Sequence, residues 1–178
     1  MKKWIVLPVL LAMGGCGLLW DDPYVTVTVT PLNWLEIHYY NTNYEPIRRT
    51  SVHIDGAGRV TVRTGASMLI SDDFAKDSSH ATWGDMREYN TVADKEHVRN
   101  LFQTLVNLGL FDREKNFRAT ETPPKGKFVA VRAAMDNKTF SEPTNIYETD
   151  PDLAEALLAV VEEFRVTRLG AKTMSKRK

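Results

Sequence analysis

The apolar residues of this chain change their spacing in a definite order along the sequence, and this order restricts the folds that the chain can adopt. Residues 50–64 read "TSVHIDGAGRVTVRT", and every second residue on both sides of the glycines is apolar. Such alternation is typical of strands that bury one face. The glycine-containing segment between them supplies the positive backbone angles of a tight reversal. We therefore expect an antiparallel hairpin.

Several other segments show the same alternation. "YVTVTVT" at residues 24–30 ends at Pro31, and "WLEIHYY" at residues 34–40 follows it. The second segment places Leu35, Ile37 and Tyr39 on one face and Trp34, Glu36, His38 and Tyr40 on the other. Further strands are predicted at residues 86–92, at 127–135 ("KFVAVRAAM") and at 138–143 ("KTFSEP"), the last two joined through Asp136 and Asn137.

Two segments have the spacing of amphipathic helices instead. The first follows Asp94, a suitable N-cap, and stops near Gly109. Its predicted inward residues are Val98, Leu101, Phe102, Leu105, Val106 and Leu108. The second begins with Asp150 as N-cap and Pro151 in the first turn. Its predicted inward residues are Leu153, Leu157, Val160, Val161 and Phe164.

The order of these elements is strands, helix, strands, helix. It predicts an α+β fold, with an antiparallel sheet of about five to seven strands and two helices packed on one face. With 43% hydrophobic residues, the chain can build one sizeable core, which we assign to a single domain at residues 24–166.

The N-terminus has the three parts of an export signal. Lys2 and Lys3 precede an uncharged apolar run at residues 4–13, and the small residues Gly14 and Gly15 come directly before Cys16, the only cysteine. This order resembles the lipobox of bacterial lipoproteins, although Met13 stands where leucine is usual.

The resemblance implies a signal peptide at residues 1–15, cleavage between Gly15 and Cys16, and a diacylglyceryl group on the Cys16 thiol. Residues 16–23 would then be the lipid anchor and a short tether. Gly17, which is not aspartate, implies the periplasmic face of the outer membrane. Two alternatives stay open: an uncleaved membrane anchor at residues 4–20, and an ordinary secretory signal that is cut elsewhere.

Charge excludes one class of partner and leaves a question at the C-terminus. The chain carries 23 basic and 23 acidic residues, whereas nucleic-acid binding needs a basic excess. After Glu163, however, six basic residues follow with no acidic one. We assign residues 167–178 to a basic tail, which either stays solvated or lies on anionic lipid headgroups.

No pattern indicates catalysis or a cofactor. The four histidines lack the spacings of zinc sites, and Asp77, Ser78 and His80 are adjacent in one segment, whereas a catalytic triad assembles from distant segments. We expect neither metal nor cofactor, and a binding protein rather than an enzyme; an envelope hydrolase is the remaining alternative.

The segment at residues 65–90 is long and polar, and it contains two large aromatic residues, Phe74 and Trp83. Aromatic anchors are enriched at interfaces, so these two residues are candidates for partner binding. The competing interpretation is that both rings close one end of the core.

The succession "VHIDGAGRVTVRTG", "EHVRNLFQTLVNLGLFD", "KFVAVRAAMDNKTF" and "DPDLAEALLAVVEEF" resembles small bacterial envelope domains, including emfourin-type metalloproteinase inhibitors. The resemblance implies a fold rather than an activity, and it carries over no inhibitory residue. It suggests a lipid-anchored binding or accessory module of the cell envelope, whose partner is an unknown envelope protein. A proteinase-inhibitor-like module that binds a peptidase is the alternative.

Overall fold

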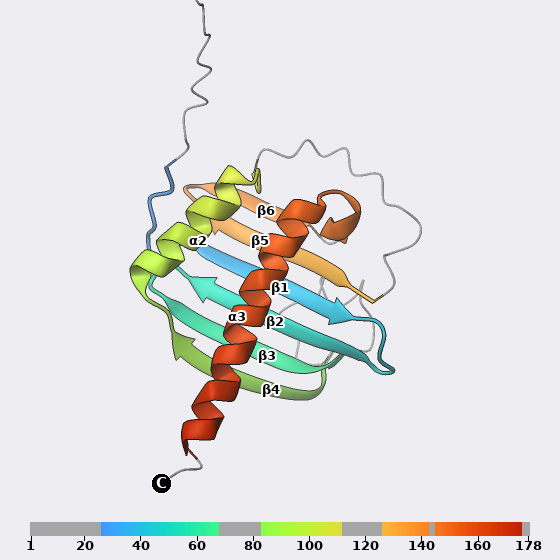
Figure 1. The fold of residues 1–178 in the computed structure, drawn as a ribbon. Helices are drawn as coiled ribbons and strands as arrows, with labels where there is room; N and C mark the ends of the chain where they lie inside the picture. Colours follow the sequence, from blue (N-terminus) through green and yellow to red (C-terminus); the bar gives the residue numbers. More distant parts are fainter. Residues whose placement is uncertain (1–25, 68–82, 112–125, 143–144, 176–178) are drawn as a thin grey trace, which may run out of the picture.

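The structure is a computed structural model that describes residues 26–67, 83–111, 126–142 and 145–175, with the side chains of the last helix described as far as Arg165 (Figure 1). The predicted signal peptide, Cys16 and Phe74 lie outside the described residues. No helix in the described part of the chain is both long and apolar enough to cross a membrane.

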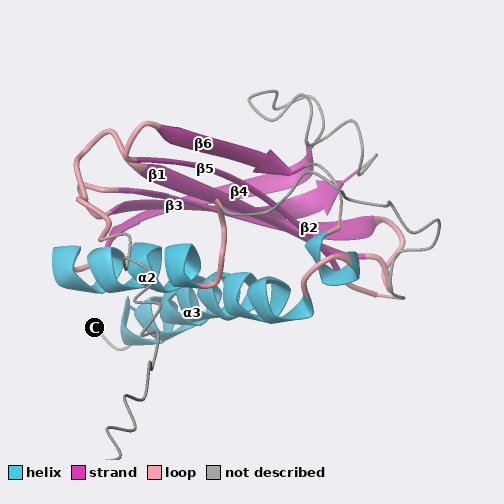
Figure 2. Cartoon of the chain, turned by 90° about the horizontal axis from the view of Figure 1, so that it is seen from above, coloured by secondary structure: helices cyan, strands magenta, loops and turns pink. Residues whose placement is uncertain are grey.

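One antiparallel sheet of six strands forms the centre of the molecule, in the order β4-β3-β2-β1-β5-β6. The strands are β1 (Trp34–Asn41), β2 (Ile47–Asp55), β3 (Arg59–Ser67), β4 (Trp83–Val92), β5 (Phe128–Met135) and β6 (Lys138–Glu142). Both helices lie on the same side of this sheet (Figure 2). The predicted α+β fold is therefore confirmed.

The two predicted hairpins form, and their turn residues explain why. In the β2–β3 turn the backbone φ of Gly58 is 88°, a value that side chains disfavour. In the β5–β6 turn Asp136 and Asn137 have φ of 47° and 64°. Two successive positive angles match the right-handed twist of the flanking strands, and asparagine and aspartate tolerate them best among non-glycine residues.

The helices begin where the capping residues predict. Helix α2 (Lys95–Asn107) is capped by Asp94, whose Oδ1 accepts hydrogen bonds from the amides of Glu96 at 2.8 Å and His97 at 3.2 Å. Helix α3 (Pro151–Ser175) is capped by Asp150, which accepts a hydrogen bond from the Leu153 amide at 2.9 Å. Between β6 and α3, the short 3₁₀ helix η2 (Ile146–Glu148) is tied to β5, because buried Asn145 accepts a hydrogen bond from the Val129 amide at 3.0 Å.

The main core lies between the helices and one face of the sheet. Strands β1, β2, β3 and β5 contribute alternate apolar residues, and α3 packs across β5, β1 and β2. All five predicted inward residues of α3 are buried. In α2 the prediction was wrong for Leu108, which is 38% exposed because it is the C-cap residue and lies past the last regular turn.

The prediction of a strand at residues 24–30 is wrong for its described part, residues 26–30, which form no strand. The amide of Val27 donates to Oε1 of Gln103 at 2.9 Å, and the amide of Thr28 donates to Oδ2 of Asp136 at 3.0 Å. The segment buries Val27, but these two amides donate to side chains of a helix and a turn instead of to a neighbouring strand. Alternation of apolar residues alone does not distinguish a strand paired in a sheet from a segment whose amides bond to side chains.

Two boundaries also differ from the sequence analysis. Strand β4 begins at Trp83, three residues before the predicted start. Helix α3 continues to Ser175 and therefore includes residues 167–175, which were assigned to the basic tail.

Candidate functional site

The candidate site is the face of the sheet that is turned away from both helices, called here the helix-free face (Figure 2). Directly paired residues of antiparallel strands point to the same side, so the register identifies the members of this face. They form rows that run across the strands, and several of these rows carry the polar and aromatic side chains considered below.

The first feature of this face is a buried polar cluster at the centre of the sheet, called here the buried array: Glu36, His38, Tyr40 and Arg49, together with Trp83. Arg49 is 1% exposed and His38 is fully buried. Nη2 of Arg49 lies 2.9 Å from Nδ1 of His38, and Nε2 of His38 lies 3.7 Å from Oε1 of Glu36. A buried arginine is rare unless it is paired, so these contacts explain why it is tolerated.

The contact between Arg49 and His38 fixes the tautomer of the imidazole. A guanidinium can only donate hydrogen bonds, so Nδ1 of His38 must be the acceptor and Nε2 carries the proton. The carboxylate of Glu36 lies 3.7 Å from this nitrogen, a distance at which the contact is electrostatic and not a hydrogen bond. The order carboxylate, neutral imidazole, guanidinium therefore places opposite charges at the two ends of the array.

Aromatic rings enclose the guanidinium of Arg49. Its central carbon lies 3.9 Å from the centroid of the Trp83 ring and 5.4 Å from that of Tyr40. Phe128 packs edge-on against Tyr40 at a centroid distance of 5.5 Å. Cation–π contacts of this kind are strongest where water is excluded, which is the case for Arg49.

The second feature is a polar row that crosses all six strands. Its members, one from each strand in sheet order, are Asn90, Thr61, His53, Glu36, Arg132 and Ser141. Asn90 and Ser141 at the two ends are exposed, and His53 and Arg132 are half-buried. Glu36 is buried and shared with the buried array, but the other five members of this row can reach another molecule.

Trp34 lies beside the polar row, between two of its members. Its ring stacks on His53 at a centroid distance of 6.0 Å, and the guanidinium carbon of Arg132 lies 5.9 Å from its centroid. Trp34 is half-buried, so these neighbours hold the ring in place while part of it stays accessible.

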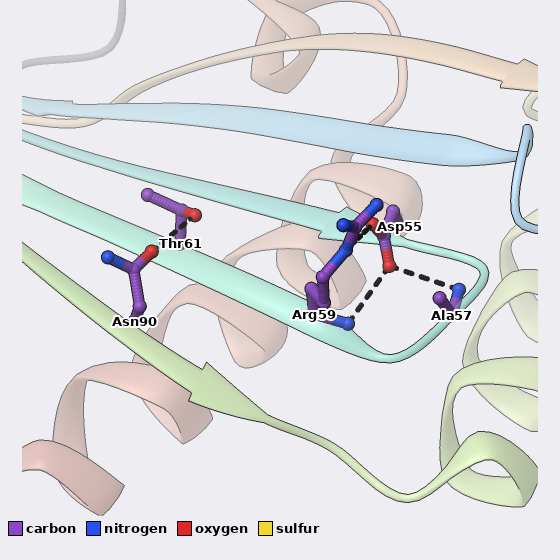
Figure 3. A network of polar contacts seen from close by, with 5 residues as sticks. All are labelled: Asp55, Ala57, Arg59, Thr61 and Asn90. Atoms are coloured by element: carbon purple, nitrogen blue, oxygen red, sulfur yellow. Dashed lines mark hydrogen bonds and ion pairs between the residues drawn. The ribbon is translucent and has the colours of Figure 1, made fainter.

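A hydrogen-bonded turn joins β2 to β3 beside the polar row, two residues from both His53 and Thr61 (Figure 3). Oδ1 of Asp55 accepts hydrogen bonds from the amides of Ala57 at 3.0 Å and Arg59 at 2.9 Å, and Oδ2 accepts one from Nε of Arg59 at 2.6 Å. Burial acts to raise the pKa of the Asp55 carboxyl, but the hydrogen bonds from Arg59 outweigh it and hold the pKa below its usual range. Asp55 is thus ionised at neutral pH.

Next to this turn, the hydroxyl of Thr61 bonds to Oδ1 of Asn90 at 2.8 Å (Figure 3). Residues of the turn and of the polar row together line an open depression of about 570 Å³: His53, Asp55, Arg59, Val60, Thr61, Asn90, Thr91 and Val92. Val92 at its edge is 76% exposed. The depression therefore combines hydrogen-bonding groups with an accessible apolar side chain.

Of the two candidates from the sequence for partner binding, Phe74 lies outside the described residues and Trp83 is the first residue of β4. Trp83 is half-buried and packs on Arg49, so it belongs to the sheet. Sequence reasoning missed Arg49 and Arg132. Alternation did place Trp34, Glu36, His38 and Tyr40 together on the face opposite to the core, and this face is the helix-free one.

The chemistry available on this face is hydrogen bonding, ion pairing and aromatic stacking. Within the described ranges, no three histidine, cysteine, aspartate or glutamate side chains gather closely enough to hold a metal ion. No protein-family model and no curated protein matches the sequence. The interpretation of the face therefore depends on its own residues.

Proposed function

We propose that this protein is a lipid-anchored binding module of the bacterial cell envelope, and that it contacts an envelope protein through the helix-free face of its sheet. The anchor part of the proposal is supported by the order of Lys2, Lys3, the apolar run and Gly15-Cys16. In this proposal residues 1–15 are removed, and the lipid on Cys16 keeps the domain at the membrane, at the periplasmic face of the outer membrane.

The observation that carries the binding part is the polar row with Trp34 beside it. A sheet face that contacts only water does not require a tryptophan packed between a histidine and an arginine, as Trp34 is here. Tryptophan and arginine are the residues most enriched among side chains that dominate binding energy. Buried Arg49 and His38 lie in the neighbouring part of the same face. Their contact helps to keep the strands that carry Trp34 and the polar row rigid.

The anchor is tested by Cys16→Ser. A hydroxyl is a much weaker nucleophile than a thiolate and cannot accept the diacylglyceryl group, so we expect incorporation of a clickable fatty acid to fall to background. Met13→Leu is the control; it introduces the residue usual at this position and should label at least as strongly as the wild type. Equal labelling of the wild type and Cys16→Ser would disprove the lipid anchor.

The binding face is tested by pull-down from detergent-solubilised envelopes with Trp34→Ala/His53→Ala. This double variant removes the stacked pair and should lose at least about tenfold in captured partner, the loss typical of removing one or more dominant interface residues. A second variant, Asn90→Arg/Ser141→Arg, adds bulk and charge at the two exposed ends of the row without altering buried residues, and should also reduce capture.

The matched control is Tyr44→Ala/Leu108→Ala, which truncates two exposed large side chains outside the helix-free face. It should capture as much partner as the wild type. Full capture by both face variants, with melting temperatures showing that they are folded, would reject this face as the binding site. Specific capture of a peptidase would favour the inhibitor-like alternative over an accessory role in an envelope assembly.

A further inference from the structure

A second feature lies at one end of strands β2, β3 and β4, where α3 passes over the sheet. It is an open notch of about 790 Å³, called here the arginine notch. Its lining residues are Arg48, Arg49, Thr50, Thr64, Gly65, Asp85, Met86, Arg87 and Arg165. Four of them are arginines, but Arg49 belongs to the buried array on the opposite face, so Arg48, Arg87 and Arg165 against the one carboxylate give the notch its positive surplus.

The strand register explains why cationic side chains converge here. Thr50 pairs with Thr64, and Thr64 pairs with Arg87, so these three residues point to the same side of the sheet. Arg48 lies two residues from Thr50 on the same strand and shares its side, which is the side of the helices. The third guanidinium comes from Arg165 of α3.

A β-bulge shapes the floor of the notch. The pairing of β3 with β4 shifts between Thr64 and Ala66, and Asp85 opposite this point has a φ of 52°. A Cβ on Gly65 would lie 2.7 Å from the carbonyl oxygen of Gly84, so only glycine lets the two strands approach this closely. Bulges often redirect side chains at functional sites, and this one lies next to Arg87.

The arginines of the notch differ in their partners. Arg49 bonds to His38, and Nε of Arg165 donates to Oε2 of Glu162 at 2.8 Å. Arg48 and Arg87 are exposed and form no ion pair or hydrogen bond with any side chain of the described residues. Two guanidinium groups, on the two strands that flank β3, thus face the same space with unused donors, and their charges reinforce each other.

We propose that the arginine notch binds a phosphate group, presented either by a membrane lipid headgroup or by a small soluble phosphate compound. A phosphate carries oxygens in several directions and can accept hydrogen bonds from Arg48, Arg87 and Arg165 on three separate elements, while a carboxylate offers two oxygens in one plane. The guanidinium fork matches phosphate in a bidentate manner, and the hydroxyl of Thr50 adds a donor on the floor. This site is separate from the helix-free face and goes beyond the function proposed above.

The test uses the full-length protein, purified in micelles of a neutral detergent at constant ionic strength. One arm titrates inorganic phosphate by calorimetry. The other adds phosphatidic acid to the micelles and measures the melting temperature, with phosphatidylcholine as the uncharged comparison. A response in both arms means that the phosphate group itself is recognised, and a response only to phosphatidic acid assigns the site to a lipid headgroup.

The diagnostic variant is Arg48→Gln/Arg87→Gln, for which we expect at least about tenfold weaker binding, because two charge-assisted contacts are lost. Arg48→Lys/Arg87→Lys retains the charge but removes the forked geometry, and should fall between this variant and the wild type. The charge-matched control, Lys95→Gln/Arg99→Gln on the exposed side of α2, should bind like the wild type. Circular dichroism verifies that all variants are folded.

Three outcomes would overturn the proposal. The first is the absence of any response of the wild type in both arms. The second is equal binding by the wild type and Arg48→Gln/Arg87→Gln, which would place the phosphate elsewhere. Equal losses in the notch variant and in the control on α2 would also reject the site, since they would show attraction by overall charge only.

Discussion

Replacing Arg49 by alanine is expected to destabilise the domain by about 3 to 5 kcal/mol, the cost typical of removing one partner from a buried charged cluster. The guanidinium is almost fully buried, it bonds to His38, and the Trp83 ring lies on it. Its loss leaves a cavity under Trp83, and Nδ1 of His38 loses its donor. Circular dichroism melts of the full-length protein in detergent should show a drop on the order of 10 °C.

The matched control is Arg63→Ala, an arginine on the neighbouring strand and on the same face. Its Nε lies 2.9 Å from Oε2 of Glu88, but the two side chains are 29% and 37% exposed. Such a pair is screened by solvent and contributes less than about 1 kcal/mol. If both variants melted at the same temperature, the buried array would have no special role in stability.

Leu157→Asp is expected to prevent folding altogether. Leu157 is fully buried in the first half of α3 and belongs to the hydrophobic core between this helix and the sheet. Removing its side chain costs about 2 to 5 kcal/mol, and the unpaired carboxylate adds a desolvation penalty of several kcal/mol. The sum reaches the whole stability of a typical domain, about 5 to 15 kcal/mol. The variant should show no cooperative melting transition.

Ala159→Asp is the control for this change, because Ala159 is on the same helix and exposed. It should fold and melt within a few degrees of the wild type, since the introduced charge stays in water. A cooperative transition for Leu157→Asp near that of the wild type would mean that the inward face of α3 is assigned wrongly.

The sequence predicted those parts of the fold that depend on local chemistry. Asp94 and Asp150 cap their helices because a short carboxylate accepts from free amides at a helix N-terminus. Asp136 and Asn137 make the β5–β6 turn because both tolerate positive φ. Alternation in β1 separated the core residues from the opposite face, and this separation identified part of the candidate site.

The sequence could not predict features that arise from pairing between distant segments. Arg49 has the pattern of an outward-facing strand residue, which indicates exposure, yet Trp83 and Tyr40 cover its guanidinium. The polar row takes one residue from each of six strands, and only the register aligns them. The arginine notch depends on the bulge at Gly65 and on α3 reaching over the sheet, and neither leaves a periodic signal.

The central place of β1 has a consequence for how the chain acquires its structure. Strands β1 to β4 pair with their neighbours in sequence and can form as a meander, but the second edge of β1 pairs with β5, which follows only after β4 and α2. Contacts between segments far apart in sequence form slowly, because the chain loses the entropy of closing a long loop before these contacts contribute any stability. Until β5 arrives, the backbone of β1 is an open edge able to pair with other chains. A protein that crosses a membrane unfolded would be most prone to aggregation during this interval, and the docking of the β5–β6 hairpin ends it.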